Sequence, residues 1–378
     1  MEKRFEACML LHALGDTIGF KNSEWEFNFH NSEYKDVGIN SHITMEIVFQ
    51  FIELGGIKHI NLKDWIVSDD TVLHLATAEA LISKYKNLTE FEDKTASLYV
   101  KGIKDKYELR YFGVITGTNI CRIIDGKDWR KLEYNFEFGG SGAAMRTSCI
   151  GLAFYGKKNR GLLIQSSLEA SRITHNSVIG YLGGVTSALF TAFAIEQIPI
   201  EEWCFRLVDI LDSNVIETYL EKSGPKSRGL KEYKRDKNIF IDQWKKYIEM
   251  RFDSNKKPIY SKVMRNIAER IDFYYENFSR KIHNDNGKQL KVYFPGGAGD
   301  DSVIISYDCL LDARDNWEKL VFYSMLHAGD SDTTGCIAAS WYGAFYGMDD
   351  VPKSNLKYLE YKDRIIKDAK MLYIKFSK

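Results

Sequence analysis

A scarcity of proline is the feature that most constrains the fold of this chain. Its 378 residues include five prolines, Pro199, Pro225, Pro258, Pro295 and Pro352. Proline breaks a helix because it lacks the backbone N–H and clashes with the preceding turn, so this spacing leaves long stretches in which helices can continue. The sequence therefore favours a fold rich in α-helix.

Apolar residues recur with a helical period in several of these stretches. Val72, Leu73 and Leu75, for example, fall on helical rather than alternating spacing. The spacing predicts helices over residues 2–14, 69–86, 162–173, 180–195, 316–326 and 333–346. We expect Gly15 to end the first of them. No convincing β-hairpin lies between these helices, which predicts an all-α fold.

The lysine-rich segment 223–258 allows two interpretations. Its Gly and Pro residues are typical of a linker between domains, whereas Ile239, Phe240, Ile241 and Trp244 indicate a buried helix face. The acidic residues among its lysines indicate a solvated surface rather than a patch for polyanions. The chain contains no internal repeat. We therefore expect one large helical domain over residues 1–378.

Charge, cysteine spacing and hydropathy argue against several classes of protein. With 52 basic and 52 acidic residues, the chain has no net charge to attract nucleic acid or an anionic membrane. Its six cysteines are scattered, without the paired spacing of zinc sites or disulfide scaffolds, and are expected to be reduced core thiols. No signal peptide opens the chain, and no apolar run approaches the roughly 20 residues of a membrane span. We expect a soluble, cytoplasmic monomer.

Two short acidic clusters carry the strongest chemical signal. In Ser68-Asp69-Asp70-Thr71, the serine stands where a helix N-cap belongs and the two carboxylates fall in the first turn. Taken alone, this is an ordinary helix start. The second cluster, Gly329-Asp330-Ser331-Asp332-Thr333, precedes another apolar helix and repeats the same chemistry.

Four carboxylates with flanking hydroxyls are hard oxygen ligands. Such ligands suit Mg²⁺, Mn²⁺ or Ca²⁺ and suit zinc or copper poorly. Paired divalent ions orient substrate hydroxyls and lower the pKa of water, which is the chemistry of hydrolysis. Because the clusters lie far apart in the sequence, their spacing alone leaves helix capping and metal binding as alternatives.

The residues around the first cluster resemble the ADP-ribosylglycohydrolases, and among them the eukaryotic ADP-ribosylarginine hydrolases. Residues 65–81, WIVSDDTVLHLATAEAL, are similar to the signature of that subfamily. The similarity continues along the whole chain, at residues 1–3, 15–16, 25–27, 140–146, 174–175, 180–183, 307–308 and 327–332. It implies an all-α, single-domain fold with a binuclear magnesium centre on one side of an ADP-ribose cleft.

The resemblance also implies the metal ligands. They are Ser68, Asp69, Asp70, Asp330, Asp332 and Thr333, which would hold two Mg²⁺ ions, with Mn²⁺ as an alternative. Glu26 would lie on a loop near the distal ribose and the metals. Asp16 either closes the first helix or takes a direct part.

For the substrate, the resemblance implies a diphosphate held by the loop at Gly140, Ser141 and Gly142. Flexible backbone before a helix suits that role, and it equally suits a tight turn. The resemblance places His175 at the cleft as a substrate contact, whereas an isolated histidine is commonly a hydrogen-bonded core group.

Members of the family cleave the N-glycosidic bond between ribose and an arginine guanidine, and ADP-ribose is released. The resemblance therefore implies Mg-dependent removal of mono-ADP-ribose from arginine side chains of modified proteins. Asp69 or Asp70 would orient or deprotonate the attacking water, and Glu26 is the first candidate for the general acid. The alternatives are hydrolysis of serine-linked or poly(ADP-ribose) or of O-acetyl-ADP-ribose, a catalytically inactive ADP-ribose-binding protein, and a two-metal phosphohydrolase.

Two segments depart from the family pattern. Asp300 stands where relatives have a histidine and Val303 where they have a proline, in a loop expected on the adenosine side of the cleft. The usual His-Pro after residue 175 is replaced around Ser177 and Val178, at the expected cleft rim. Since neither change touches the metal ligands, we expect effects on nucleoside affinity and leaving-group preference.

Overall fold

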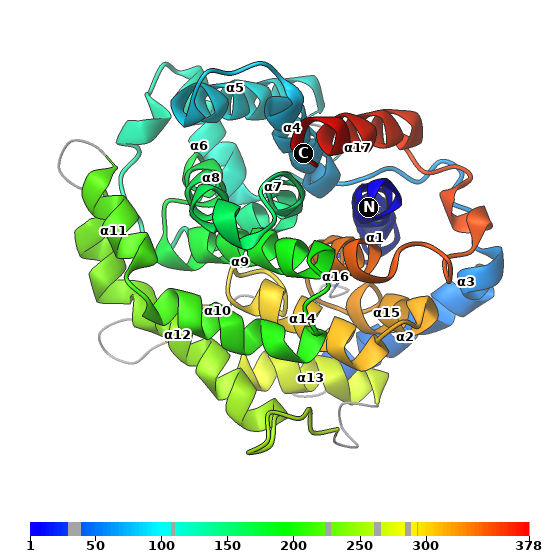
Figure 1. The fold of residues 1–378 in the computed structure, drawn as a ribbon. Coiled ribbons are helices and arrows are strands. Elements are labelled where there is room, and N and C mark those ends of the chain that lie inside the picture. Colours follow the sequence, from blue (N-terminus) through cyan, green and yellow to red (C-terminus); the bar gives the residue numbers. More distant parts are fainter. Residues whose placement is uncertain are drawn as a thin grey trace.

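The computed structural model describes residues 1–28, 39–106, 110–223, 228–260, 266–283, 289–292 and 294–377. Figure 1 shows that these residues are almost entirely helical. The α-helices are α1 (Glu2–Phe20), α2 (Ile39–Glu53), α3 (Gly56–His59), α4 (Asp69–Ile82), α5 (Leu88–Lys106), α6 (Val114–Ile124), α7 (Ser148–Ala153), α8 (Arg160–Arg172), α9 (Val178–Ile195), α10 (Trp203–Asp212), α11 (Val215–Lys222), α12 (Leu230–Arg251), α13 (Ile267–Asn277), α14 (Asp301–Ala313), α15 (Trp317–Ser324), α16 (Ser331–Tyr346) and α17 (Lys362–Phe376). Short 3-10 turns join them, among them η4 (Ser141–Arg146).

One antiparallel hairpin departs from the predicted all-α fold. Strand β1 (Lys281–His283) pairs with β2 (Gln289–Val292), with Lys281 opposite Val292. The sequence carries the dipeptide Asn286-Gly287 between the two strands, which is typical of hairpin turns and could have predicted the pairing. These two residues lie outside the described part of the chain.

All six predicted helices are present, but their ends differ from the prediction. Helix α4 ends at Ile82 rather than at residue 86, because Ser83 takes an extended conformation. Helix α1 continues five residues beyond Gly15, to Phe20. The prediction that Gly15 ends this helix is wrong. The lack of a side chain at Gly15 allows another helix to pack closely against α1.

Helices α1 and α16 pack against each other along their lengths, in opposite directions (Figure 1). A Cβ at Gly15 would lie 2.4 Å from the carbonyl oxygen of Gly335, and a Cβ at Gly343 would lie 2.5 Å from that of Ala7. Real Cβ atoms do not come so close to backbone oxygens, so these contacts require glycine. The first and last parts of the chain therefore meet backbone to backbone.

Helix α9 forms the centre of the core, and all of its residues are buried. Phe190 contacts the rings of Trp203, Trp244, Tyr307 and Trp341 with centroids 5.1–5.5 Å apart, a spacing typical of favourable aromatic pairs. By length and composition α9 is a candidate membrane span, but the whole helix is buried inside the protein, and core helices pass the same test.

The segment predicted as either a linker or a buried helix contains α12, whose residues Phe240, Ile241 and Trp244 are buried. The buried face is confirmed, although Ile239 is exposed. Helix α12 is also tied to α14 by charge, since Arg251 Nε donates to Asp308 Oδ1 at 2.6 Å within the core. Charge-assisted hydrogen bonds of this kind hold the segment against the core.

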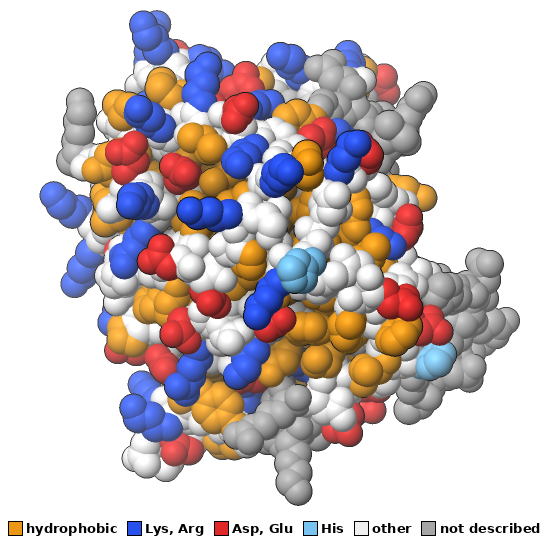
Figure 2. Space-filling model, turned by 90° about the vertical axis from the view of Figure 1, so that its right-hand side faces the viewer, with side chains coloured by type: hydrophobic (Ala, Val, Ile, Leu, Met, Phe, Trp, Pro, Cys, Tyr) orange, Lys and Arg blue, Asp and Glu red, His pale blue; other side chains and the backbone are white. Residues whose placement is uncertain are grey.

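The surface in Figure 2 mixes basic and acidic side chains, in keeping with the zero net charge. The same face has an apolar area (Figure 2). Among the exposed apolar side chains of the molecule are Met45, Phe49 and Ile52 of α2. All six cysteines are free thiols, of which Cys121 is exposed and the other five are buried. The prediction of core thiols is therefore wrong for Cys121 alone.

Replacing Gly15 by alanine should destabilise the fold by roughly 1–3 kcal/mol, because the added methyl group overlaps the backbone of α16. The matched control is Gly117→Ala in α6, where an added Cβ meets nothing within 4 Å. The control should be neutral or stabilising by about 0.5–1 kcal/mol, since alanine favours a helix. Urea unfolding followed by circular dichroism measures both, and equal unfolding free energies for the two variants would contradict the packing argument.

Candidate metal and substrate site

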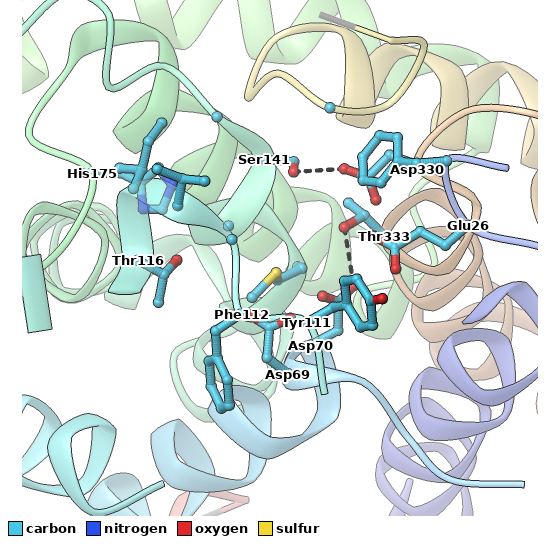
Figure 3. Close-up of a pocket in the computed structure, with 18 of the residues that line it drawn as sticks. Glu26, Asp69, Asp70, Tyr111, Phe112, Thr116, Ser141, His175, Asp330 and Thr333 are labelled. Carbon is cyan, nitrogen blue, oxygen red and sulfur yellow. Dashed lines mark hydrogen bonds between the residues drawn. The ribbon is translucent and has the colours of Figure 1, made fainter. Parts of the chain in front are cut away.

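The two acidic clusters meet at the N-terminal ends of α4 and α16 (Figure 3). Thr333 Oγ1 donates to Asp70 Oδ2 at 3.0 Å, across 263 positions of sequence. Ser68 is the N-cap of α4, and its side chain accepts a hydrogen bond from Asp70 N at 3.1 Å. The helix start predicted from the sequence is therefore present, and the fold brings the second cluster to it.

Helix α1 fixes the position of both helix starts. Asp16 Oδ1 accepts a hydrogen bond from Ser68 N at 2.9 Å, and Asp16 Oδ2 accepts one from Thr71 N at 3.1 Å. One turn further along, the carbonyl of Gly19 accepts from Ser331 Oγ at 2.9 Å. Asp16 does not close α1, as one interpretation held, but caps the start of α4 from a neighbouring helix.

Glu26 joins the cluster from the loop after α1. Oxygens of Glu26, Asp330 and Asp332 all lie within 4.8 Å of one another, a grouping that can hold a metal ion. The loop is fixed on both sides of Glu26, since Trp25 is buried and Phe27 N donates to Gly329 O at 3.1 Å. The structure thus places Glu26 among the candidate ligands, a set from which the sequence prediction had left it out.

Burial and mutual repulsion raise the pKa values of these carboxyls. Burial is the larger cause for Glu26, Asp69, Asp70 and Asp332, whose pKa values all lie well above the ordinary range, and neighbouring carboxylates raise them further. The pKa of Asp330 is raised mainly by burial as well. The positive charge of Arg146 lowers the pKa of Asp69, but less than burial and the neighbouring carboxylates raise it.

This donor set fits a hard divalent cation. Its carboxylates are buried or half-buried and repel one another, and a bound cation would supply the charge that stabilises their ionised forms. Asp69, Asp70, Asp330 and Thr333 line the adjoining cavity, whereas Ser68 is fully buried below it.

The cavity beside the cluster has a volume of about 410 Å³, which is in the range of small-molecule sites. The glycine loop lines this cavity as well, and Ser141 points toward Asp330 at the start of α16 (Figure 3). Ser141 Oγ donates to Asp330 Oδ2 at 2.9 Å, and Ser141 N donates to Gly297 O at 3.1 Å. The loop and the acidic cluster therefore belong to one cavity, as predicted.

His175 also lines this cavity. Its Nδ1 lies 2.8 Å from Thr174 Oγ1, and burial keeps the pKa of the imidazole well below its usual value. The ring packs against the glycine loop, where a Cβ at Gly142 would lie only 2.7 Å from His175 Cε1. His175 is accordingly a neutral polar group at the site, and Gly142 is needed to admit it.

Two expectations about the cavity rim are wrong. Asp300 and Val303 are buried in α14 and its N-cap, and neither lines the cavity. Asp300 caps α14 by accepting from Asp301 N at 3.0 Å. Ser177 and Val178 are likewise fully buried, with Ser177 Oγ bonded to Phe136 O at 3.0 Å. The residues that depart from the family pattern are therefore packed in the interior and do not form part of the cavity wall.

Several residues that line the cavity were missed by the sequence analysis. They include Phe27, Tyr111, Phe112, Val114, Thr116, Met145 and Phe294. They are single residues drawn from separate loops, from the start of α6 and from the 3-10 turn η4, so no common sequence pattern links them and only the three-dimensional arrangement reveals them.

The cavity is lined by carboxylates at helix ends and by a glycine loop. These features are typical of helical proteins that can bind divalent cations beside a small polar ligand. The sequence and structure comparisons specify the family. The model of the ADP-ribosylglycohydrolase family matches residues 1–378. The chain therefore belongs to the ADP-ribosylglycohydrolase family and is a hydrolase of that family.

Individual relatives agree with this assignment. A protein named as an ADP-ribosyl glycohydrolase from Acanthamoeba polyphaga mimivirus is 40% identical over 93% of this chain, which spans 66% of that relative's length. ADP-ribosylhydrolase ARH1 of Dictyostelium discoideum is 33% identical over 96% of this chain and 92% of its own. A solved ADP-ribosylglycohydrolase-related protein complex shares the fold, with a TM-score of 0.55 at 17% identity over 99% of this chain and 98% of its own.

Asp332→Asn should stabilise the metal-free protein at neutral pH. The folded pKa of Asp332 lies above the unfolded value, so the folded chain binds more protons and its stability falls as pH rises through that interval. Asparagine removes this penalty, which is about 1.4 kcal/mol per pH unit of the interval. In EDTA, the advantage of the variant over wild type should be small at about pH 4 and grow toward about pH 7.5.

Thermal unfolding across this pH range measures the effect. Asp349→Asn, at an exposed position, is the matched control, and its difference from wild type should stay flat with pH. Added Mg²⁺ should raise the melting temperature of wild type more than that of Asp332→Asn. If Asp332→Asn were no more stable than wild type at neutral pH in EDTA, the raised pKa of Asp332 would be refuted.

Proposed function

We propose that this protein removes mono-ADP-ribose from modified arginine side chains by hydrolysis that depends on two divalent cations, preferably Mg²⁺. The observation that carries the proposal is the convergence of five carboxylates from α4, α16 and the Glu26 loop beside one cavity. The family membership of the whole chain supports ADP-ribose as the substrate class.

The cations would be held by Asp69, Asp70, Asp330, Asp332 and Thr333. Ser68 caps α4 behind these residues and would serve as an additional ligand. When bound, Mg²⁺ supplies a Lewis acid that polarises ribose hydroxyls and lowers the pKa of water.

Asp69 and Asp70 are placed to orient the attacking water and to accept its proton. Both line the cavity, and the N-terminal end of α4 stabilises their charge. In the same cavity, the glycine loop at Gly140 and Gly142 would bind the diphosphate. Neutral His175 would donate or accept a hydrogen bond to the substrate.

Glu26 is suited to protonate the guanidine as it leaves. The electron pair of the breaking ribose–nitrogen bond goes to nitrogen, so the guanidinium of the substrate departs as a neutral guanidine that takes up a proton. Burial and the nearby charges of Asp330 and Asp69 raise the pKa of Glu26 well above the usual value, which favours its protonated form. The same side chain lies within ligand distance of Asp330 and Asp332, so it could instead serve as a cation ligand.

Arginine as the acceptor is supported by the relative named ARH1, which matches nearly the whole chain at 33% identity. ADP-ribosylhydrolase ARH3 of Mus musculus, in comparison, is 24% identical over 76% of this chain and 71% of its own. Together with the similarity of residues 65–81 to the signature of ADP-ribosylarginine hydrolases, the higher identity to ARH1 favours arginine-linked ADP-ribose.

The purified protein should release ADP-ribose from an arginine-linked ADP-ribosyl peptide in Mg²⁺ and lose this activity in EDTA. Chromatographic measurement of ADP-ribose in both buffers tests the dependence, and a serine-linked peptide in parallel tests the acceptor. Equal rates in Mg²⁺ and EDTA would overturn the metal mechanism, and cleavage of the serine-linked peptide alone would overturn arginine as the substrate.

Asp69→Asn should reduce turnover by at least about a hundredfold, because it removes both a ligand and the group that orients water. The fold should persist, since asparagine keeps the shape and its amide removes a repelling charge. Calorimetric titration with Mg²⁺ should show weakened binding, while Asp349→Asn should behave as wild type in both assays. Retained activity in Asp69→Asn would remove this residue from the mechanism.

A further inference from the structure

Tyr111 lies at the mouth of the cavity, on the side of the acidic cluster. It lines the cavity with Asp69, Asp70 and Glu26, and in Figure 3 its ring projects over the end that carries these carboxylates. Its side chain is 68% exposed, which is unusual for an aromatic ring beside a concave site. An exposed ring in this place can contact a ligand that extends out of the cavity.

The backbone of Tyr111 is held in an unfavourable conformation. Its φ angle is +49°, a region that bulky side chains rarely adopt and that costs energy unless the surroundings enforce it. The preceding residue is anchored on both sides. Arg110 forms hydrogen bonds to both carboxylate oxygens of Glu360 at 2.7 and 3.0 Å, and its carbonyl accepts from Asp69 N at 3.1 Å. Tyr111 therefore follows directly on a backbone link to the acidic cluster.

A second aromatic residue repeats this arrangement. Phe27 follows Glu26, has a φ angle of +46°, and lines the same cavity. Its ring packs against Phe294 at 5.9 Å, whereas the ring of Tyr111 meets Phe20 edge to face at 6.3 Å and is otherwise largely open. Of the two, Tyr111 is the ring available to a ligand.

An aromatic face beside carboxylates is the chemistry that selects an organic cation. Resting on the proposed function, we infer that Tyr111 binds the positively charged guanidinium of the modified arginine and thereby selects cationic over neutral acceptors. The planar guanidinium stacks on the ring. This contact therefore involves the part of the substrate that leaves. ADP-ribose itself, which lacks the guanidinium, lies deeper in the cavity and does not depend on this contact.

The test compares Tyr111→Leu, Tyr111→Phe and Phe49→Leu in the full chain. Leucine keeps apolar bulk but loses the ring, phenylalanine keeps the ring, and Phe49 is a 60% exposed aromatic residue of α2 that does not line the cavity. With an arginine-linked peptide in Mg²⁺, Tyr111→Leu should raise KM roughly five- to tenfold with little change in kcat. Tyr111→Phe and Phe49→Leu should stay within about twofold of wild type. Calorimetry should give one Kd for ADP-ribose in all four proteins.

The possible outcomes separate this inference from the proposed function. A wild-type protein that releases no ADP-ribose from the arginine-linked peptide overturns both. An active wild type with an unchanged KM in Tyr111→Leu overturns the inference alone. The inference also fails if Tyr111→Leu weakens ADP-ribose binding as much as it raises KM, because the ring then contacts ADP-ribose, or if Tyr111→Phe loses as much as Tyr111→Leu, because the hydroxyl is then the contact.

Discussion

Backbone contact between α1 and α16 is the constraint on which the site depends. Glycines let the two helices approach so closely that a methyl group does not fit between Gly15 and Gly335. Both acidic helix starts are then tied to α1, one through Asp16 and the other through the carbonyl of Gly19. A single helix therefore sets the distance between carboxylates that are more than 260 positions apart in the sequence.

The same geometry opposes the stability of the metal-free protein. The N-terminal ends of α4 and α16 direct partial positive charge at the carboxylates, yet burial and repulsion still raise the pKa values of Asp69, Asp70 and Asp332 well above the ordinary range. Helix ends alone do not compensate for so many buried acids. The cluster therefore holds more buried acid than Arg146 and the helix ends offset, so that binding of a cation would increase the stability of the fold directly.

Local features of the site could be read from the sequence, and long-range ones could not. Ser68 as an N-cap followed from residue type and position alone. The contact of Asp70 with Thr333 did not follow from spacing, and the meeting of the two clusters was expected only through family resemblance. Gly15 shows the limit in physical terms, because a glycine in a helical pattern is equally a stop signal or a contact point, and the partner that decides, Gly335, lies 320 positions away. Asp300 shows it again, since a change within a recognised motif proved to cap a buried helix rather than to face the cavity.

The candidate cation ligands lie at helix ends, whereas the candidate group for recognition of the departing side chain lies in a loop. For this reason the sequence indicated the ligands but not the residue that recognises the acceptor. Cation ligands must be held to within a few tenths of an ångström, which suits the first turns of packed helices, and these leave a recognisable pattern in the sequence. A group that recognises the departing side chain must instead stand at the open mouth, on backbone free of a helical pattern. Tyr111 meets that requirement with a φ angle of +49°, a conformation that tyrosine does not favour, directly after the anchored Arg110. Chains with identical ligands can thus differ in what they release from ADP-ribose, because the mouth changes without disturbing the helices beneath it.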